Sequence, residues 1–280
     1  MFQDRKIVIA TMHQKEKVIS PILEKELGVR AVIPVNFNTD QFGTFTREIK
    51  RAGDQLQAAR KKAEAAMKIT GADLAISSEG TFGAHPSFPL AQSNLELVLF
   101  IDKKNNLEVR GHHRTPRTNL NNARVSSVDQ ALKIAEEWGF PENGIIIRKN
   151  ESGKLWIYKD IDSFEKLEKQ VSQMLKWPFT NQVFIETDMR AHKNPLRMEA
   201  IQKATEDLIK NIKSICPQCN LPGFVTTGVE RGLVCKLCGR ATDVPAFEIR
   251  SCLKCKYEEK IKITKNGESA NAEYCEFCNP

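Results

Sequence analysis

Apolar and polar positions in residues 1–213 follow two different periods. Short apolar runs bounded by polar residues or glycine are typical of buried strands, and apolar positions every three or four residues are typical of helices. The predicted strands cover residues 6–11, 30–35, 72–77, 95–101, 107–112, 144–148, 154–158 and 182–186. The predicted helices cover residues 15–27, 54–70, 128–138, 161–175 and 198–213. Because the chain opens as strand, helix and strand, we expect an α/β domain in residues 1–213, with a mixed sheet and helices on both faces.

The cysteines indicate a second domain, residues 214–280. All eight lie after residue 215, as four C-x-x-C pairs: Cys216/Cys219, Cys235/Cys238, Cys252/Cys255 and Cys275/Cys278. A C-x-x-C turn directs two thiolates to one side, and two such turns complete the tetrahedron that zinc prefers. The spacing therefore predicts a double zinc ribbon with two structural zinc ions, each bound by four cysteines.

The pairing of the four turns stays open between two arrangements. Fifteen residues separate Cys219 from Cys235 and nineteen separate Cys255 from Cys275, so consecutive turns suit two sequential ribbons. A nested arrangement would join the middle two turns, which flank a strand-like stretch. We favour the sequential arrangement. In either case four thiolates leave zinc no open position, so the metal is expected to stabilise the fold rather than to catalyse.

The net charge and the N-terminal residues limit the classes of protein to which this sequence can belong. The formal net charge is +7, but two zinc ions bound to eight thiolates would lower it to about +3, which is not strongly basic. The first apolar run, residues 7–12, is too short for a signal peptide or a membrane span. We therefore expect a cytoplasmic protein of a reducing compartment, without membrane contact; disulfides would require an oxidising one.

Three polar clusters follow predicted strands, where α/β sheets bind their ligands. The first contains Thr11, His13 and Lys15, in a strand-to-helix turn whose N–H groups and lysine suit an anion. In the second, Glu79 lies in a loop beside glycine, where a carboxylate could bind a hard cation such as Mg²⁺ or Mn²⁺. Both clusters could instead be an ordinary helix start and an ordinary turn.

The third cluster, residues 188–197, is the densest in charge. It contains Asp188, Arg190, His192 and Arg197. Arginine binds phosphate through two parallel hydrogen bonds, and a nearby carboxylate adds a cation ligand. The alternative is a charged approach to the last helix, with Asp188 or Asn194 as its cap.

Nearly the whole chain resembles a bacterial family known only as domain of unknown function 6671. The resemblance lies in residues 9–16 (IATMHQKE), 42–47 (FGTFTR), 78–83 (SEGTFG), 186–192 (ETDMRAH), Asn194-Pro195 and the cysteines. It implies no activity.

About the first 100 residues are also distantly similar to the inosine triphosphate pyrophosphatase and Maf-like superfamily. The similarity lies in residues 10–15 (ATMHQK), in Lys62-Ala63 at a helix end and in Glu79-Gly80, with Arg190-Ala191-His192 as a later basic motif. It implies that Lys15 contacts phosphate and that Glu79 is half of an acidic pair binding Mg²⁺. The other half stays open among Glu16, Glu64 and Glu96.

The leading hypothesis is a metal-dependent hydrolase of a nucleotide or other phosphate-bearing small molecule. Its predicted catalytic residues are Glu79, Asp188 and His192, and its predicted substrate-binding residues are Thr11, His13, Lys15, Arg190 and Arg197. The alternative is a non-catalytic module whose zinc ribbons bind nucleic acid or protein. Its basic and aromatic contacts would be Lys254, Lys256, Lys260, Lys262, Lys265, Tyr257 and Phe277.

Overall fold

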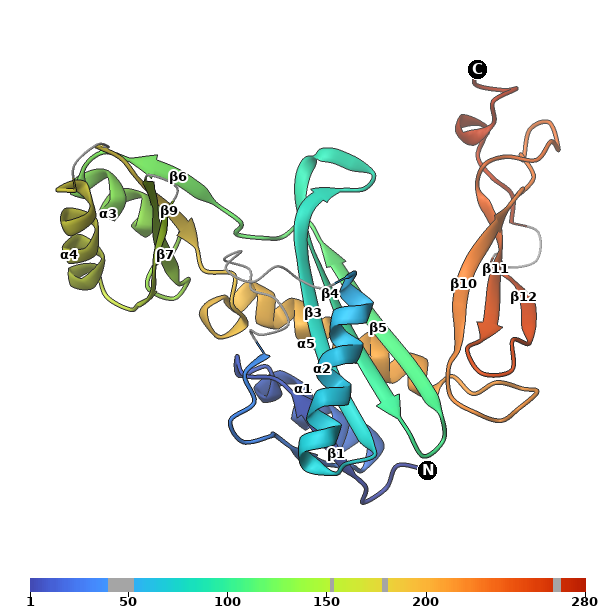
Figure 1. Cartoon of the computed structure of the whole chain (residues 1–280). Helices are drawn as coiled ribbons and strands as arrows, with labels where there is room; N and C mark the ends of the chain where they lie inside the picture. Colours follow the sequence, from blue (N-terminus) through green and yellow to red (C-terminus); the bar gives the residue numbers. More distant parts are fainter. Residues whose placement is uncertain (40–52, 152–153, 178–180, 264–267) are drawn as a thin grey trace. The chain divides into compact units, whose positions relative to one another are not determined.

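The computed structural model describes residues 1–39, 53–151, 154–177, 181–263 and 268–280 (Figure 1). The motif at residues 42–47 and Lys265 lie outside the described residues. The chain divides into two compact units: unit 1 contains residues 1–101 and 110–207, and unit 2 contains residues 102–109 and 208–280. No helix among the described residues is both long enough and apolar enough to cross a membrane.

A five-stranded mixed sheet forms the first part of unit 1, with the strand order β2-β1-β3-β4-β5. Its strands are β1 (Lys6–Ala10), β2 (Arg30–Val32), β3 (Leu74–His85), β4 (Phe88–Asp102) and β5 (Leu107–Thr115). The strand β1 lies between β2 and β3 and is parallel to both of them. The segment predicted as a loop after residue 77 continues as strand, and β3 turns into β4 only at residues 86–87. The sheet therefore extends further than the apolar run indicates.

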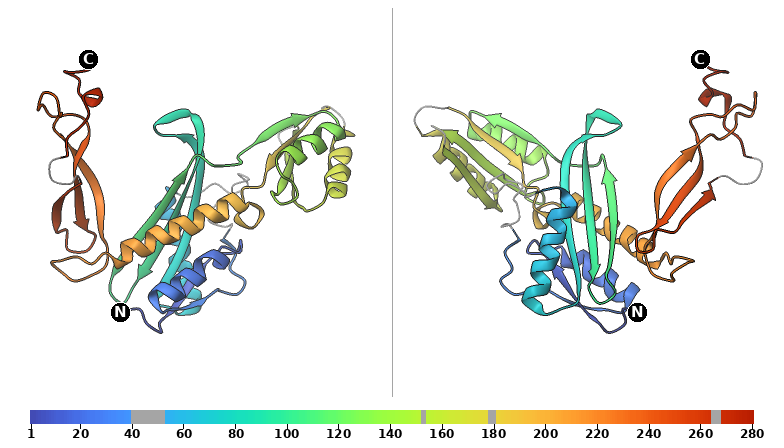
Figure 2. Two further views of the ribbon diagram at one scale, coloured as in Figure 1. Left: turned by 180° about the vertical axis from the view of Figure 1, so that it is seen from behind. Right: turned by 45° about the vertical axis from the view of Figure 1, so that its right-hand side comes forward.

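Helices cover both faces of this sheet. The helix α2 (Gln55–Thr70) lies on one face, and α1 (Glu16–Leu27) and α5 (Pro195–Lys213) lie on the other (Figure 2). Val8 and Ala75 of the sheet pack against Ala63 and Met67 of α2. Since neighbouring strand residues point to opposite faces, odd-numbered residues of β3 face α2 and even-numbered residues face α1 and α5.

A second sheet in unit 1 has four strands, in the order β6-β9-β7-β8. Its strands are β6 (Asn122–Val125), β7 (Ile145–Glu151), β8 (Lys154–Ile161) and β9 (Val183–Thr187), and every neighbouring pair is antiparallel. The helices α3 (Val128–Glu137) and α4 (Phe164–Leu175) share its buried core, which includes Ile147, Val171 and Ile185. The expected single sheet is therefore wrong: β9 pairs with β6 and β7, which closes a separate sheet.

Unit 2 contains an antiparallel sheet of β10 (Phe224–Arg231), β11 (Pro245–Cys252) and β12 (Glu258–Lys262), with β11 in the middle. The turn between β4 and β5 belongs to the same unit: Lys254 Nζ donates a hydrogen bond to the Asn106 carbonyl oxygen at 3.0 Å. Each strand carries the chain from one end of this sheet to the other.

Candidate functional site

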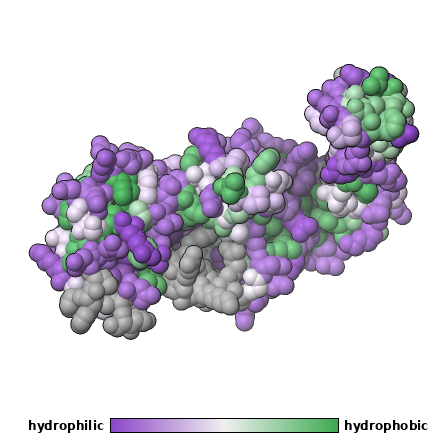
Figure 3. Space-filling model, turned by 90° about the horizontal axis from the view of Figure 1, so that it is seen from above, coloured by the Kyte–Doolittle hydropathy of each residue, from purple (hydrophilic) through white to green (hydrophobic). Residues whose placement is uncertain are grey.

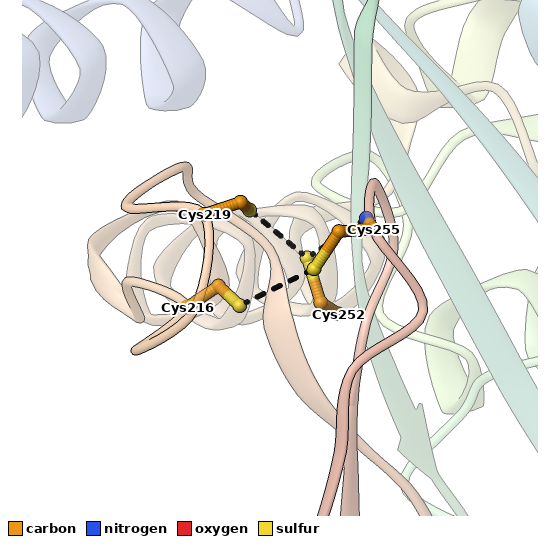
Figure 4. A group of neighbouring side chains, drawn as sticks. All are labelled: Cys216, Cys219, Cys252 and Cys255. Atoms are coloured by element: carbon orange, nitrogen blue, oxygen red, sulfur yellow. Dashed lines mark hydrogen bonds between the residues drawn. The ribbon is translucent and has the colours of Figure 1, made fainter.

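The cysteines of unit 2 form two groups of four, each able to hold one metal ion. Cys216, Cys219, Cys252 and Cys255 make the first tetrad (Figure 4), and Cys235, Cys238, Cys275 and Cys278 make the second. The Sγ atoms of Cys216 and Cys255 lie 3.7 Å apart, and those of Cys238 and Cys275 lie 3.6 Å apart. Four sulfurs at about 2.3 Å from a tetrahedral zinc would lie about 3.8 Å from one another. The spacing fits a metal ion, whereas a disulfide would need about 2 Å.

The tetrads interleave along the chain, so the favoured sequential pairing is wrong, and the nested pairing is wrong as well. The reason is the antiparallel sheet. Phe224 at the start of β10 is paired with Cys252 at the end of β11, which brings the first and third turns to one end. Arg231 at the end of β10 is paired with Pro245, and β12 runs back toward this opposite end. There Cys235 bridges to Ala270, shortly before the fourth turn.

Backbone N–H groups stabilise negative charge on the sulfurs. The N–H of Leu237 donates to Cys235 Sγ at 3.4 Å, and that of Lys254 donates to Cys252 Sγ at 3.3 Å. The N–H groups of Cys238 and Leu237 lower the pKa of Cys235 to about 7. Such second-sphere hydrogen bonds are characteristic of thiolates that bind metal. The tetrads therefore have the sulfur distances of metal ligands. The pKa is lowered to about 7 at Cys235 and Cys252, and it is raised at Cys219, Cys255 and Cys278, beside other thiols of the same tetrads.

A second group of polar side chains lies in unit 1, on the sheet face that α1 and α5 cover. Lys15, at the start of α1, donates through Nζ to Ser78 Oγ at 2.9 Å and to the Ser78 carbonyl oxygen at 3.2 Å. Arg197 of α5 pairs through Nε with Glu96 Oε1 of β4 at 2.8 Å, with both side chains at most 1% exposed. We call Lys15, Ser78, Glu96 and Arg197 the buried charge cluster.

Gly80 makes room for this cluster. A Cβ atom at residue 80 would lie 2.5 Å from Glu96 Oε1 and 2.7 Å from Arg197 Nη2. Only a residue without a side chain therefore allows the Glu96–Arg197 pair to lie against β3. The SEGTFG motif thus has a packing reason for its first glycine.

Burial and neighbouring cations lower the pKa of Lys15 to about 7, with Arg197 and Lys62 as the main cations. Glu96 and Glu79 act in the opposite direction but do not balance the lowering. The group is therefore partly neutral near pH 7, and a bound anion would favour its charged form.

Two histidines lie next to the cluster. The rings of His13 and His192 stack with their centroids 5.1 Å apart and an angle of 13° between their planes. Burial and then the charges of Lys15, His192, Arg197 and Arg190 lower the pKa of His13 to about 3. Burial, with Arg190 next, also lowers the pKa of His192. The two rings are therefore stacked in their neutral forms, in a region of positive potential.

Glu79 points to the opposite face of the sheet. It is adjacent to Ser78 in β3, and its Oε1 atom pairs with Lys62 Nζ of α2 at 2.5 Å, with both side chains buried. The structure thus brings Lys15, His13, His192 and Arg197 together, and it separates Glu79 from them by the thickness of the strand.

Arg190 and Asp188 bind each other. Arg190 donates from Nε and from its backbone N–H to Asp188 Oδ1, and its Nη2 lies 2.8 Å from Asp160 Oδ1. Asp188 is 1% exposed. Arg190 is therefore paired with two carboxylates, those of Asp188 and Asp160. Thr11, 4% exposed, accepts a hydrogen bond from the His13 N–H at 3.3 Å, and a shallow pocket of about 590 Å³ opens beside it.

The pairing of Lys62 with Glu79 and that of Glu96 with Arg197 were missed from the sequence. Lys62 follows Ala58 by four residues and Ala59 by three, so it lies on the small, buried stripe of α2. That spacing could have identified it. The sequence offers Glu96 only as one of three possible carboxylate partners of Glu79. Its pairing with Arg197, 101 residues later, leaves no local pattern in the sequence.

These features define a mixed α/β protein with a buried charge cluster and two cysteine tetrads that could each hold a structural metal ion. The family described as Domain of unknown function (DUF6671) matches residues 62–280, and the chain belongs to it. The matched part contains both tetrads, Glu96 and Arg197, while the Thr11–Lys15 turn precedes it. No curated protein matches the chain, so the similarity to nucleotide pyrophosphatases receives no support.

Proposed function

We propose that unit 1 binds a phosphate-bearing small molecule at the buried charge cluster and hydrolyses it. One observation supports the binding step above all: Lys15 and Arg197 lie buried on the same face of the sheet, where Arg197 pairs with Glu96 and its charge helps to lower the pKa of Lys15 to about 7. Buried basic groups that lower each other's affinity for protons favour an anionic ligand, because the anion stabilises their charged forms. Burial is the main cause of the lowered pKa of His13, and the positive charges of Lys15, Arg197 and Arg190, which lower it further, also favour an anion.

In the proposed reaction, Lys15 and Arg197 hold the phosphate, since phosphoryl transfer relies mainly on positioning and on neutralised charge. The neutral ring of His192 accepts a proton from the water that attacks phosphorus; the P–O bond to the leaving group breaks, and the leaving oxygen takes a proton from the His192 imidazolium. Its Nδ1 atom is buried and has no hydrogen-bond partner among the described residues. Glu79 and Asp188 each face a cation instead of each other, which does not fit a shared Mg²⁺ or Mn²⁺ site, and we assign no step to such an ion. Their catalytic roles stay predictions.

Calorimetric titration with inorganic phosphate tests the binding step. Lys15→Met should weaken phosphate binding about 10- to 100-fold, which corresponds to one charged hydrogen bond. The matched control is Lys17→Met, because Lys17 lies half a turn further on and is exposed. Equal affinity in the wild type and Lys15→Met would remove the basis of the proposal. Phosphate release from a panel of phosphomonoesters and nucleoside triphosphates, with His192→Gln for comparison, tests the chemical step.

For unit 2 we propose two structural zinc ions, one in each tetrad. Four thiolates with sulfur spacings of 3.6 to 4.0 Å support zinc in a closed coordination shell. A closed shell leaves no position for substrate, so the zinc ions would stabilise the zinc-ribbon fold that we infer for this unit.

A binding role for unit 2 is the second candidate, because hydrophobic side chains gather at its surface (Figure 3). Leu237 and Phe277, 72% and 61% exposed, lie inside two C-x-x-C turns of the second tetrad. Arg240 stacks over the Phe277 ring at 3.6 Å from its centroid. Exposed aromatic and apolar side chains with an arginine favour a protein partner.

Two of the residues proposed to bind nucleic acid already make contacts within unit 2. Tyr257 packs against Phe224, and Lys260 pairs with Glu230 at 2.5 Å. Fluorescence anisotropy with a labelled single-stranded oligonucleotide at low salt tests this form of the candidate, and binding that Phe277→Ala abolishes would favour it.

A further inference from the structure

Glu96 has one carboxylate oxygen without a hydrogen-bond partner in a place that excludes solvent. Its side chain is 0% exposed, Oε1 accepts from Arg197 Nε at 2.8 Å, and Oε2 has no partner among the described residues. A buried polar atom without a partner is strongly unfavourable, and more so when it carries charge. The native state therefore needs a donor at this atom.

The neighbouring donors of the cluster are directed elsewhere. Arg197 donates from Nη1 to the Met189 carbonyl oxygen, and both hydrogen bonds of Lys15 Nζ go to Ser78. Placing a side chain on Gly80 would only crowd Glu96 and Arg197. Among the described residues no donor reaches Oε2, so a bound molecule that carries its own donor would satisfy this atom.

We propose that Glu96 selects an oxyanion that carries its own O–H group, such as hydrogen phosphate, over one that carries none. In this assignment, which rests on the proposed function, Lys15 and Arg197 attract the negative charge and Glu96 Oε2 accepts a hydrogen bond from the ligand O–H. An anion without a proton would place an oxygen against Oε2, and the two negative charges would repel each other. The site thus recognises inorganic phosphate, the product of the proposed hydrolysis.

Hydrogen phosphate and sulfate are suitable probes, because both are tetrahedral dianions at about pH 7.5 and only phosphate retains a proton. Calorimetric titration of the full-length wild type with each anion should give phosphate an affinity about 10- to 100-fold higher than sulfate. Glu96→Gln keeps the side-chain shape and an oxygen for Arg197, and it replaces Oε2 by an NH₂ donor. It should weaken phosphate, strengthen sulfate and bring the affinity ratio to about 1 or below.

The matched control is Glu199→Gln, an exposed carboxylate on the same helix as Arg197, which should keep the wild-type ratio. Equal affinity of the wild type for the two anions overturns the role of Glu96 and leaves the proposed anion site standing. That result needs no variant, so the test holds even if Glu96→Gln does not fold. Binding of neither anion overturns the proposed function and this inference together.

Discussion

Unit 1 encloses extended apolar cores, whereas the described residues of unit 2 gather into small clusters around its cysteines and its sheet. The four-stranded sheet of unit 1 and its two helices bury a continuous core that includes Phe140, Leu167 and Met174. Unit 2 has two small clusters of three buried residues each, and one of them consists of Phe224 with Cys216 and Cys252. Small clusters supply little hydrophobic stabilisation, so we expect metal binding at the tetrads to contribute much of the stability of unit 2. The two units should therefore respond to different perturbations.

Metal removal should have the largest effect, and only on unit 2. Binding of zinc to four thiolates contributes on the order of 10 kcal/mol to folding. We expect two zinc ions per chain by plasma mass spectrometry, and loss of protease resistance in residues 208–280 after chelation. All three tryptophans, Trp138, Trp156 and Trp177, belong to unit 1, so their fluorescence should stay unchanged. A chelated protein with a resistant unit 2 would contradict the expectation.

Double variants separate the interleaved pairing from a sequential one. Cys216→Ser with Cys252→Ser removes two ligands from one tetrad, so about one zinc should remain per chain. Cys216→Ser with Cys235→Ser damages both tetrads and should leave little zinc. A sequential pairing would give the reverse order of zinc contents.

Breaking the Glu96–Arg197 pair should have the next largest effect, and only on unit 1. Arg197→Ala leaves a buried carboxylate without its cation, which lowers the free energy of unfolding by about 3–5 kcal/mol. Urea unfolding followed by tryptophan fluorescence measures the change. Lys203→Ala, on the exposed side of the same helix, breaks an exposed pair with Glu206 and should change stability by at most about 1 kcal/mol. Zinc content should stay the same in both variants.

Titration of Lys15 should give the smallest effect within any one pH unit. Its folded-state pKa of about 7 lies below the ordinary lysine value of 10.5, so between these values the unfolded state binds more protons. The free energy of unfolding therefore gains a contribution that rises with pH, by at most about 1.4 kcal/mol per pH unit. Below about pH 7 both states are protonated and the contribution stays at its minimum. Lys15→Met should lose this slope, measured as the difference between urea titrations of the two proteins from pH 7 to 10, and equal slopes would contradict it.

The two units also differ in what their sequences reveal. Spacing within each C-x-x-C turn identifies the candidate metal ligands, because the two cysteines of a turn belong to the same tetrad. Spacing does not identify the partner turn, because three strands decide which turns share an end of the sheet, and the pairing of Phe224 with Cys252 is a tertiary feature.

In unit 1 the helices α1 and α2 and the strand β1 follow from periodicity, and so do the capping glycines Gly28 and Gly71. The second half of β3 cannot be predicted from periodicity, since its polar residues 78–85 resemble a loop in the sequence. Lys15 and Arg197 could be singled out as charged residues after strands, but their shared partner Glu96 could not. Strand alternation separates Ser78 from Glu79, and that separation places the sequence-predicted carboxylate on the other face.

Interleaving also sets the order of events while the chain is being made. Synthesis supplies the third turn only after the 36 residues from Cys219 to Cys255, a delay of about 2 to 7 seconds at bacterial rates of elongation. During that time the thiols of the first two turns are present without a complete coordination shell, and zinc cannot yet close either tetrad. The second tetrad closes only when Cys278 of the fourth turn is present. A nascent chain therefore exposes the thiols of its first two turns until the third and fourth turns have been made.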